Sequence, residues 1–199
     1  MVLSRLVLDL QDPAARRDLS NRYEMHRTLA RLDPSGEDRL LWHLEIGKDH
    51  APRVLIQTRR EPDPAALHGA GGSYYLSFES RPNKLLDNLR SGDRLRFRVL
   101  ANASVKRDGR RHGLYRSEDQ HAWIERQLTK HGATPLAVRV IGSSTERCWR
   151  GRGRRPITVF GVMFEGMIDV IEPDAFRRMV CLGLGHAKAL GFGLVTLGR

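Results

Sequence analysis

Cysteine is scarce in this chain, where only Cys148 and Cys181 occur among 199 residues and no CxxC pair is present. This argues against a disulfide framework and against the usual zinc-binding spacings. The sequence also lacks an apolar run long enough to cross a membrane. The N-terminal MVLSRLVLDL is short and is interrupted by Arg5. We therefore expect no secretory signal, no membrane partner, and a reduced, cytoplasmic protein.

Acidic residues are few relative to basic ones, with 23 Asp and Glu against 34 Lys and Arg, so the net charge is +11. Such a balance favours nucleic acid or another anionic surface as a partner. Hydrophobic residues make up 40% of the chain. A core can therefore form, and the length allows one large domain or two of about 90–100 residues each.

The order of the predicted elements indicates two tandem ferredoxin-like domains. Hydrophobic patterning and turn residues predict strands at residues 2–8, 39–46, 53–59, 74–78, 94–101, 136–141 and 157–164, and helices at 14–19, 21–32, 118–131 and 173–181. A short helix within residues 61–72 and a final strand after the glycine-rich C-terminal segment complete the pattern. Each half then follows the order β-α-β-β-α-β, which is the order of a ferredoxin-like unit. We predict an α+β fold with domains at 1–90 and 91–199. Residues 106–112 (KRDGRRH) have no periodicity, and we expect a basic loop there.

Residues 21–32 (NRYEMHRTLARL) predict an amphipathic helix with a chemically unusual polar side. Asn21 is a good N-cap, and Glu24 is placed to complete a capping box. One apolar stripe holds Met25, Leu29 and Leu32. The opposite side holds Tyr23, His26, Arg27 and Arg31. Arginine binds phosphate through fixed charge and paired donors, histidine moves protons near neutral pH, and tyrosine stacks on bases or donates a hydrogen bond.

The segment 147–155 (RCWRGRGRR) concentrates positive charge between two predicted strands. Its five arginines are Arg147, Arg150, Arg152, Arg154 and Arg155. A basic segment flanked by strands is typical of a hairpin tip, and a two-stranded ribbon can enter a nucleic-acid groove. Because crowded like charges repel one another, we predict that these arginines contact nucleic-acid phosphates.

The C-terminal LGLGHAKALGFGLVTLGR is rich in glycine. Gly183, Gly185, Gly191 and Gly193 surround Lys188. The segment matches neither the dinucleotide fingerprint, which needs a third glycine and a strand-to-helix order, nor a P-loop, which needs Gly-Lys-Ser/Thr. Two interpretations remain open at this stage: a loop whose backbone approaches a ligand closely with Lys188 adding charge, or a tight turn before the last strand.

The tail GLGHAKALGFGLVTL resembles the glycine-rich C-terminal signature of CRISPR RNA-processing endoribonucleases. The motif RYEMHRTL, placed after one strand and a short helical turn, resembles the CasE (Cse-type) branch of the type I-E Cascade complex. The resemblance covers essentially the whole chain. It implies tandem ferredoxin-like domains and, as substrate, the repeat hairpin of precursor CRISPR RNA.

The resemblance further implies metal-independent cleavage at the 3′ base of the stem, without a cofactor, and continued association with the cleaved hairpin and other Cascade subunits. By position in the motif, the catalytic pair falls on Tyr23 and His26, and the basic helix face on Arg27 and Arg31. RNA carries its own nucleophile, the 2′-OH, so such an enzyme needs in-line geometry, proton transfer and charge stabilisation. We expect Arg27, Arg31 or the RNA-binding Lys188 to stabilise the developing charge. Which of the two residues is the acid and which the base stays open.

Two other functions are compatible with parts of the sequence. A non-catalytic RNA-binding scaffold subunit of a CRISPR complex would share the basic surfaces but has no need of the Tyr23 and His26 pair. A nucleotide-dependent enzyme built on the glycine-rich tail is disfavoured by the failed motif matches. We expect the free protein to be a monomer.

Overall fold

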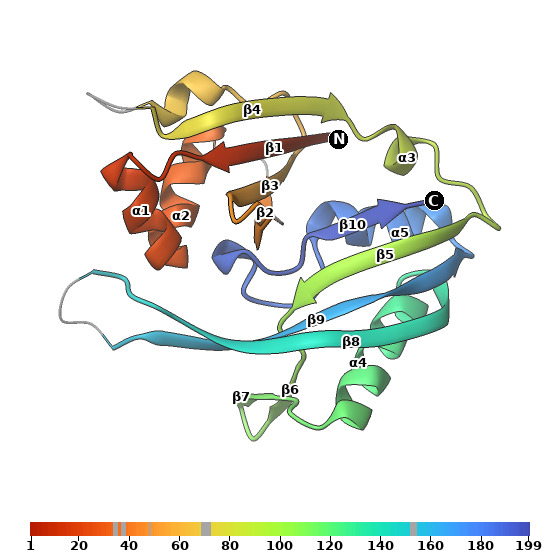
Figure 1. Cartoon of the computed structure of the whole chain (residues 1–199). Coiled ribbons are helices and arrows are strands. Elements are labelled where there is room, and N and C mark those ends of the chain that lie inside the picture. The colour runs from red at the N-terminus through yellow and green to blue at the C-terminus, as the bar shows by residue number, and fades with distance from the viewer. Residues whose placement is uncertain (34–35, 37–38, 48, 69–72, 152–154) are drawn as a thin grey trace. The chain divides into compact units, whose positions relative to one another are not determined.

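The computed structural model describes all residues except 34–35, 37–38, 48, 69–72 and 152–154, and its chain forms two compact units (Figure 1). The first unit contains Met1–Asn83, Arg147–Ile157 and Ala189–Gly191. The second contains Lys84–Glu146, Thr158–Lys188 and Phe192–Arg199. Two short segments from the second half of the sequence therefore belong to the first unit.

The first unit is built on a four-stranded antiparallel sheet in the order β2-β3-β1-β4. Its elements are β1 (Val2–Leu8), α1 (Pro13–Ser20), α2 (Arg22–Leu29), the 3-10 turn η1 (Ala30–Leu32), β2 (Leu41–Ile46), β3 (Pro52–Thr58), the 3-10 turn η2 (Pro64–Leu67) and β4 (Tyr75–Pro82). The first strand lies in the centre because it pairs with both β3 and β4.

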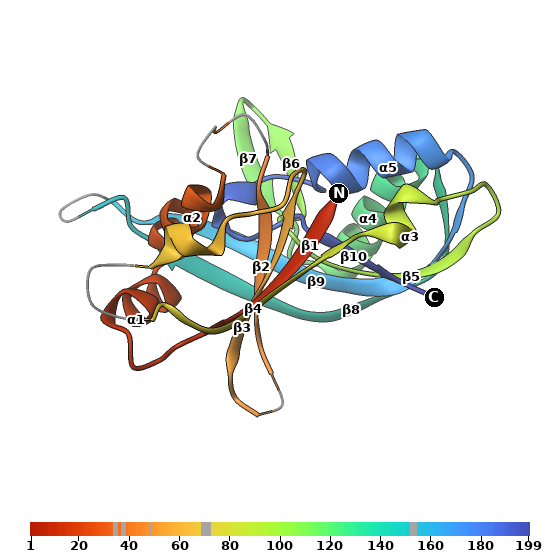
Figure 2. The same cartoon turned by 90° about the horizontal axis from the view of Figure 1, so that it is seen from above.

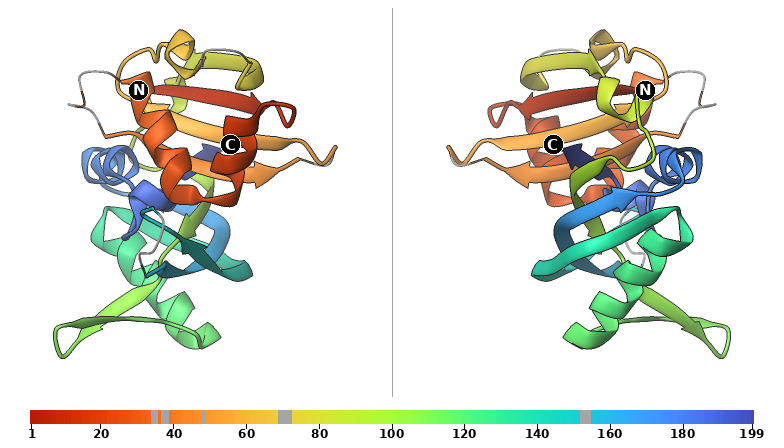
Figure 3. Two further views of the ribbon diagram at one scale, coloured as in Figure 1. Left: turned by 90° about the vertical axis from the view of Figure 1, so that its left-hand side faces the viewer. Right: turned by 90° about the vertical axis from the view of Figure 1, so that its right-hand side faces the viewer.

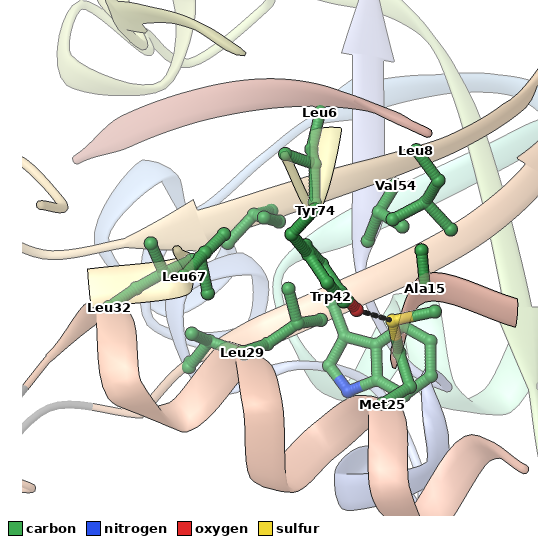
Figure 4. Close-up of a cluster of buried hydrophobic side chains, with 12 residues drawn as sticks. Leu6, Leu8, Ala15, Met25, Leu29, Leu32, Trp42, Val54, Leu67 and Tyr74 are labelled. Atoms are coloured by element: carbon green, nitrogen blue, oxygen red, sulfur yellow. Dashed lines mark hydrogen bonds between the residues drawn. The ribbon is translucent and has the colours of Figure 1, made fainter. Parts of the chain in front are cut away.

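The core of the first unit forms where α1 and α2 pack on one face of this sheet. Figure 4 shows Met25 and Leu29 of α2 among side chains from the strands, including Leu6 of β1 and Trp42 of β2. All four side chains are fully buried. The hydrophobic stripe of α2 therefore fixes which side of the helix faces the sheet.

A buried polar contact ties the two helices to the segment before β4. The Tyr74 hydroxyl donates a hydrogen bond of 2.9 Å to the Asp18 carboxylate. The same hydroxyl lies 3.4 Å from the Met25 sulfur (Figure 4). Arg17 completes the contact with an ion pair of 2.7 Å to Asp18. Burial, together with the Asp18 charge, raises the pKa of Tyr74, so its hydroxyl remains a donor.

The second unit contains a sheet in the order β10-β5-β9-β8. Its elements are α3 (Lys84–Asp87), β5 (Arg94–Ala101), β6 (Ser104–Arg107), β7 (Arg110–Gly113), α4 (Ser117–Lys130), β8 (Ala133–Cys148), β9 (Ile157–Val170), α5 (Pro173–Leu182), the 3-10 turn η3 (Lys188–Leu190) and β10 (Val195–Gly198), with the last residues of β8, the first of β9 and most of η3 assigned to the first unit. Helices α4 and α5 lie on one face of the sheet (Figure 2). Trp123 of α4 stacks on Phe164 of β9 at 5.9 Å between ring centroids.

Residues 106–112 form a β-hairpin, so the expected loop was wrong. Strands β6 and β7 pair with each other, and the hairpin projects from the second unit's four-stranded sheet (Figure 3). Its turn is Asp108-Gly109, with φ angles of 49° and 74°. Positive φ at both central residues defines the tight turn that Asp-Gly favours, and this signal was missed because the strands are too short and charged to show alternation.

Both sheets have the strand order and crossovers of a ferredoxin-like fold, which confirms the predicted α+β architecture. The strand predictions at 2–8 and 94–101 match β1 and β5 in full. The strand expected at 136–141 is much longer, since β8 covers 16 residues. Within the described part of the chain, no helix is both long enough and apolar enough to span a membrane.

Candidate active site

Helix α2 presents the site, and its local sequence determines where it starts. The Asn21 side chain accepts a hydrogen bond from the Tyr23 backbone N–H at 3.3 Å, which confirms the predicted N-cap. Glu24 does not complete a capping box in this structure. Its carboxylate instead forms an ion pair of 3.0 Å with Arg27, three residues along the helix. Met25, Leu29 and the following Leu32 are buried as predicted.

Tyr23 and His26 lie one turn apart on α2 and are both half-buried. Side chains at this spacing lie on the same side of a helix, so both can reach one phosphate group. The His26 Nδ1 atom is buried and has no hydrogen-bond partner among the residues that the structure describes. Burial lowers the pKa of His26 below its ordinary value, so the imidazole is neutral at pH 7 and able to accept a proton.

The two arginines predicted to line this helix are exposed and only loosely held. Arg27 is 65% exposed in spite of its contact with Glu24, and an ion pair of this kind contributes little to stability. The predicted helix at 21–32 tightens into the 3-10 turn η1 after Leu29, so Arg31 lies past the end of α2. It donates a long hydrogen bond of 3.4 Å to the His68 carbonyl. Both guanidinium groups are therefore available to exchange these contacts for a phosphate.

Asn21 also joins the start of α2 to the arginine-rich hairpin. Its side-chain amide donates to the Trp149 carbonyl at 3.0 Å, and its carbonyl oxygen accepts from the Trp149 N–H at 3.2 Å. The next residue, Arg150, places its guanidinium 5.6 Å from the centre of the Tyr23 ring, within the range of a cation–π interaction. One predicted hairpin arginine thus lies directly beside one predicted catalytic residue.

The other predicted hairpin arginines divide into two groups. Arg147 and Arg155 are exposed. Arg152 and Arg154 lie outside the described residues. Among the residues that are described, no group of three or more His, Cys, Asp and Glu side chains gathers as metal ligands would.

Part of the glycine-rich tail packs against α2. The Arg22 guanidinium donates to the Leu190 carbonyl at 3.3 Å and lies 5.9 Å from the centre of the Trp42 ring. Gly191 has a φ of +81°, and a Cβ there would lie 2.8 Å from the Trp42 ring and 2.9 Å from the Arg22 guanidinium. Glycine at 191 is therefore required both for the backbone conformation and for the close approach.

The rest of the tail lies in the second unit, where its glycines serve tight turns. Gly183, at the end of α5, and Gly185 have positive φ angles. Gly193 has a φ of +83°, and a Cβ there would lie 2.5 Å from the Leu184 carbonyl oxygen. The Lys188 ammonium donates to the Gly185 carbonyl at 2.7 Å. These contacts explain the glycines as parts of tight turns, which is the second of the two interpretations that the sequence left open.

The structure adds four residues to the site that the sequence did not single out for it. Arg22, Trp42 and Trp149 carried no signal, because each acts through a contact far away in the sequence. Asn21 did carry its N-cap signal, but its contact with Trp149 spans 128 positions of the chain. No periodicity or local motif encodes such a contact.

Fold and site together define a class of protein: an α+β chain of two ferredoxin-like units, with a histidine and a tyrosine beside an arginine-rich hairpin. A family model described as CRISPR associated protein matches residues 1–199. The chain belongs to this family of CRISPR-associated proteins.

Individual relatives agree with this assignment over the full length. The chain is 35% identical over 214 residues to the CRISPR-associated endoribonuclease Cse3 of Thermus thermophilus, covering 99% of each protein. It is 28% identical to the Cascade subunit CasE of Escherichia coli, covering 99% of this chain and 98% of that one. A solved structure of Cse3 bound to 19-nucleotide RNA has a TM-score of 0.90, with 35% identity and full coverage of both chains. These matches confirm the resemblance to the CasE branch.

Proposed function

We propose that this protein is a metal-independent endoribonuclease that binds the repeat hairpin of precursor CRISPR RNA and cuts it at the 3′ base of the stem. The observation that carries the proposal is the placement of His26 and Tyr23 on one side of α2, with Arg150 against the Tyr23 ring. The relative of known activity is named an endoribonuclease, and one of its structures represents a pre-cleavage complex with RNA. This protein then acts in the cytoplasm and joins other subunits of a type I-E Cascade complex.

In this mechanism the RNA 2′-oxygen attacks the adjacent phosphorus while the bond to the 5′-oxygen breaks. The 2′-OH loses a proton and the leaving 5′-oxygen gains one, giving a 2′,3′-cyclic phosphate and a 5′-hydroxyl. We assign His26 as the base because burial keeps its imidazole neutral. The Tyr23 phenol donates to the phosphate or to the leaving oxygen. Arg27, Arg31 and Arg150 stabilise the developing negative charge.

A direct test is cleavage of an end-labelled CRISPR-repeat hairpin in the presence of EDTA. We expect one cut at the 3′ base of the stem, with a 5′-hydroxyl on one fragment and a 2′,3′-cyclic or 3′-phosphate on the other. Tight binding without any cut would favour the non-catalytic scaffold alternative. A cut that disappears in EDTA would overturn the metal-independent mechanism.

The pH dependence of cleavage separates the two possible roles of His26. If it is the base, kcat/KM falls as the pH drops through the pKa of the free protein, which burial places below the ordinary histidine value of about 6.5. Bound phosphate favours the imidazolium, so the acid limb of kcat should lie at higher pH than that of kcat/KM. A rate that instead increases as the pH falls through this range would assign His26 as the acid.

Asn21 is expected to position the hairpin on α2, and two substitutions separate this role from its N-cap role. Asn21→Ala removes both, so cleavage should fall about tenfold and the free energy of unfolding by about 1 kcal/mol. Asn21→Ser retains a cap but is too short to hold the Trp149 backbone. It should lose cleavage to a similar degree while keeping near-native stability in urea. Equal activity of Asn21→Ser and wild type would show that the Trp149 contact has no role in positioning.

A further inference from the structure

A cavity of about 340 Å³ in the second unit is not used by the proposed chemistry. It lies beside the β6–β7 hairpin, the strands β8 and β9, and the glycine-rich tail. The side chains that matter here are Ser104, Arg111, Tyr115, Thr158, Phe160 and His186. Its volume is at the lower end of the range for small-molecule sites, which suits one nucleotide but not a duplex.

An aromatic pair forms one wall of this cavity. Tyr115 and Phe160 contact each other with ring centroids 4.5 Å apart and planes inclined by 47°. Tyr115 nevertheless remains 71% exposed, which is unusual for a large aromatic side chain. At Gly113, a Cβ would lie 3.4 Å from both Phe160 and the Tyr115 ring. An exposed, laterally supported ring of this kind is a surface on which a nucleobase can stack.

Polar groups line another part of the cavity, and hydrogen bonds to buried neighbours hold them in place. The Arg111 guanidinium donates to the Ser104 hydroxyl at 3.3 Å, and Ser104 in turn lies 3.1 Å from the Asn102 side-chain oxygen. The Asn102 amide donates to the Phe160 carbonyl at 2.7 Å. Asn102 also pairs through its backbone with His186. Arg111 and His186 are thus attached to one rigid frame that also holds the aromatic wall.

The charge of this cavity is positive. Burial lowers the pKa of His186, and the nearby charges of Arg111 and Lys188 lower it further. Within the described part of the chain, the residues lining the cavity include no Asp or Glu. Ala187, which follows His186, has a φ of 59°, a conformation that costs energy for a non-glycine residue and is concentrated at functional sites. The lowered pKa leaves His186 neutral at pH 7, so Arg111 supplies the fixed positive charge, and an anion bound here would pair with Arg111 and favour the protonated form of His186.

We propose that this cavity binds a single unpaired nucleotide of the RNA next to the stem, with its base on Tyr115 and its phosphate at Arg111 and His186. The assignment rests on the proposed function, because it takes the ligand to be part of the same hairpin RNA. It adds a site that reads a flanking nucleotide, separate from the site on α2. A free mononucleotide has the same chemistry, so the test must distinguish the two sources.

The test measures binding of hairpins that carry a 2′-deoxy nucleotide at the cut site and therefore stay intact. One hairpin is blunt, and two others carry three unpaired nucleotides on the 5′ or the 3′ side. Wild type should bind at least one flanked hairpin about tenfold more tightly than the blunt one, as expected for one stacked base. Tyr115→Leu should remove this difference without weakening binding of the blunt hairpin. Tyr115→Phe retains the ring and should keep it.

Arg111→Gln should likewise reduce the increase in affinity that the flanking nucleotides give. Arg110 is the adjacent arginine and does not line the cavity, so Arg110→Gln should leave this increase unchanged. If wild type binds every hairpin equally, or if Tyr115→Leu weakens the blunt and flanked hairpins alike, the nucleotide site is overturned while the proposed function stands. If no hairpin binds, the proposed function itself fails. Binding of free AMP that depends on Tyr115, with no effect of the flank, would overturn the RNA assignment in favour of a free nucleotide.

Discussion

Replacing His26 with alanine should slow cleavage of the repeat hairpin by about 10²–10⁴-fold and leave RNA affinity within about twofold of wild type. The rate falls because the neutral imidazole that accepts the 2′-OH proton is gone. Affinity survives because the arginines of α2 and of the hairpin supply the charge that binds phosphate. Single-turnover cleavage with enzyme in excess measures the first quantity, and gel shift with an uncleavable hairpin measures the second.

His121→Ala is the matched control for this variant. His121 also lies on a helix, α4 in the second unit, where its ring contacts the Ser117 carbonyl at 2.9 Å. It should cleave at the wild-type rate. Wild-type cleavage by His26→Ala would remove His26 from the mechanism. Equal losses of cleavage and of binding would instead make His26 a residue of the RNA-binding surface.

Replacing all three of Arg147, Arg150 and Arg155 by glutamine should weaken RNA binding strongly and make the affinity less sensitive to salt. Each lost phosphate contact lowers the slope of log affinity against log salt by roughly 0.7–0.9, so three contacts change it by about 2–3. At low salt the affinity should fall by about two orders of magnitude. Titrations between about 50 and 300 mM salt measure both quantities.

A second triple variant, with the same net charge, tests whether binding depends on local arginine–phosphate contacts or only on the total charge of the protein. Arg90, Arg126 and Arg178 are exposed arginines outside the hairpin and α2. Changing all three to glutamine should lower affinity only slightly and preserve the salt slope. If both triple variants behave alike, the hairpin has no special role in binding. Arg150→Gln alone should also reduce kcat, since its guanidinium contacts the Tyr23 ring.

Much of the fold could be predicted from local sequence, since strands and helices follow from the period of apolar residues. The strict alternation at 94–101 predicted β5, and the spacing of Met25, Leu29 and Leu32 predicted the buried side of α2 and of the turn η1 that follows it. The β6–β7 hairpin escaped prediction because its short, charged strands bury little apolar surface, and only the Asp108-Gly109 turn marked it. Apolar periodicity arises only where one face of a strand is buried, so it cannot identify a strand whose two faces are exposed to solvent.

By itself, the sequence determined which chemical groups this protein brings to one side of a helix, because residues three and four positions apart meet on any α-helix. That local rule brings Tyr23, His26 and Arg27 to neighbouring positions on α2, whereas Arg31 follows on the 3-10 turn η1. Only the tertiary structure decided that Asn21 holds Trp149, that Arg150 meets the Tyr23 ring, and that Gly191 fits against Trp42. These partners are separated by more than a hundred positions, and their contacts depend on the tertiary fold of the first unit rather than on any repeat in the chain.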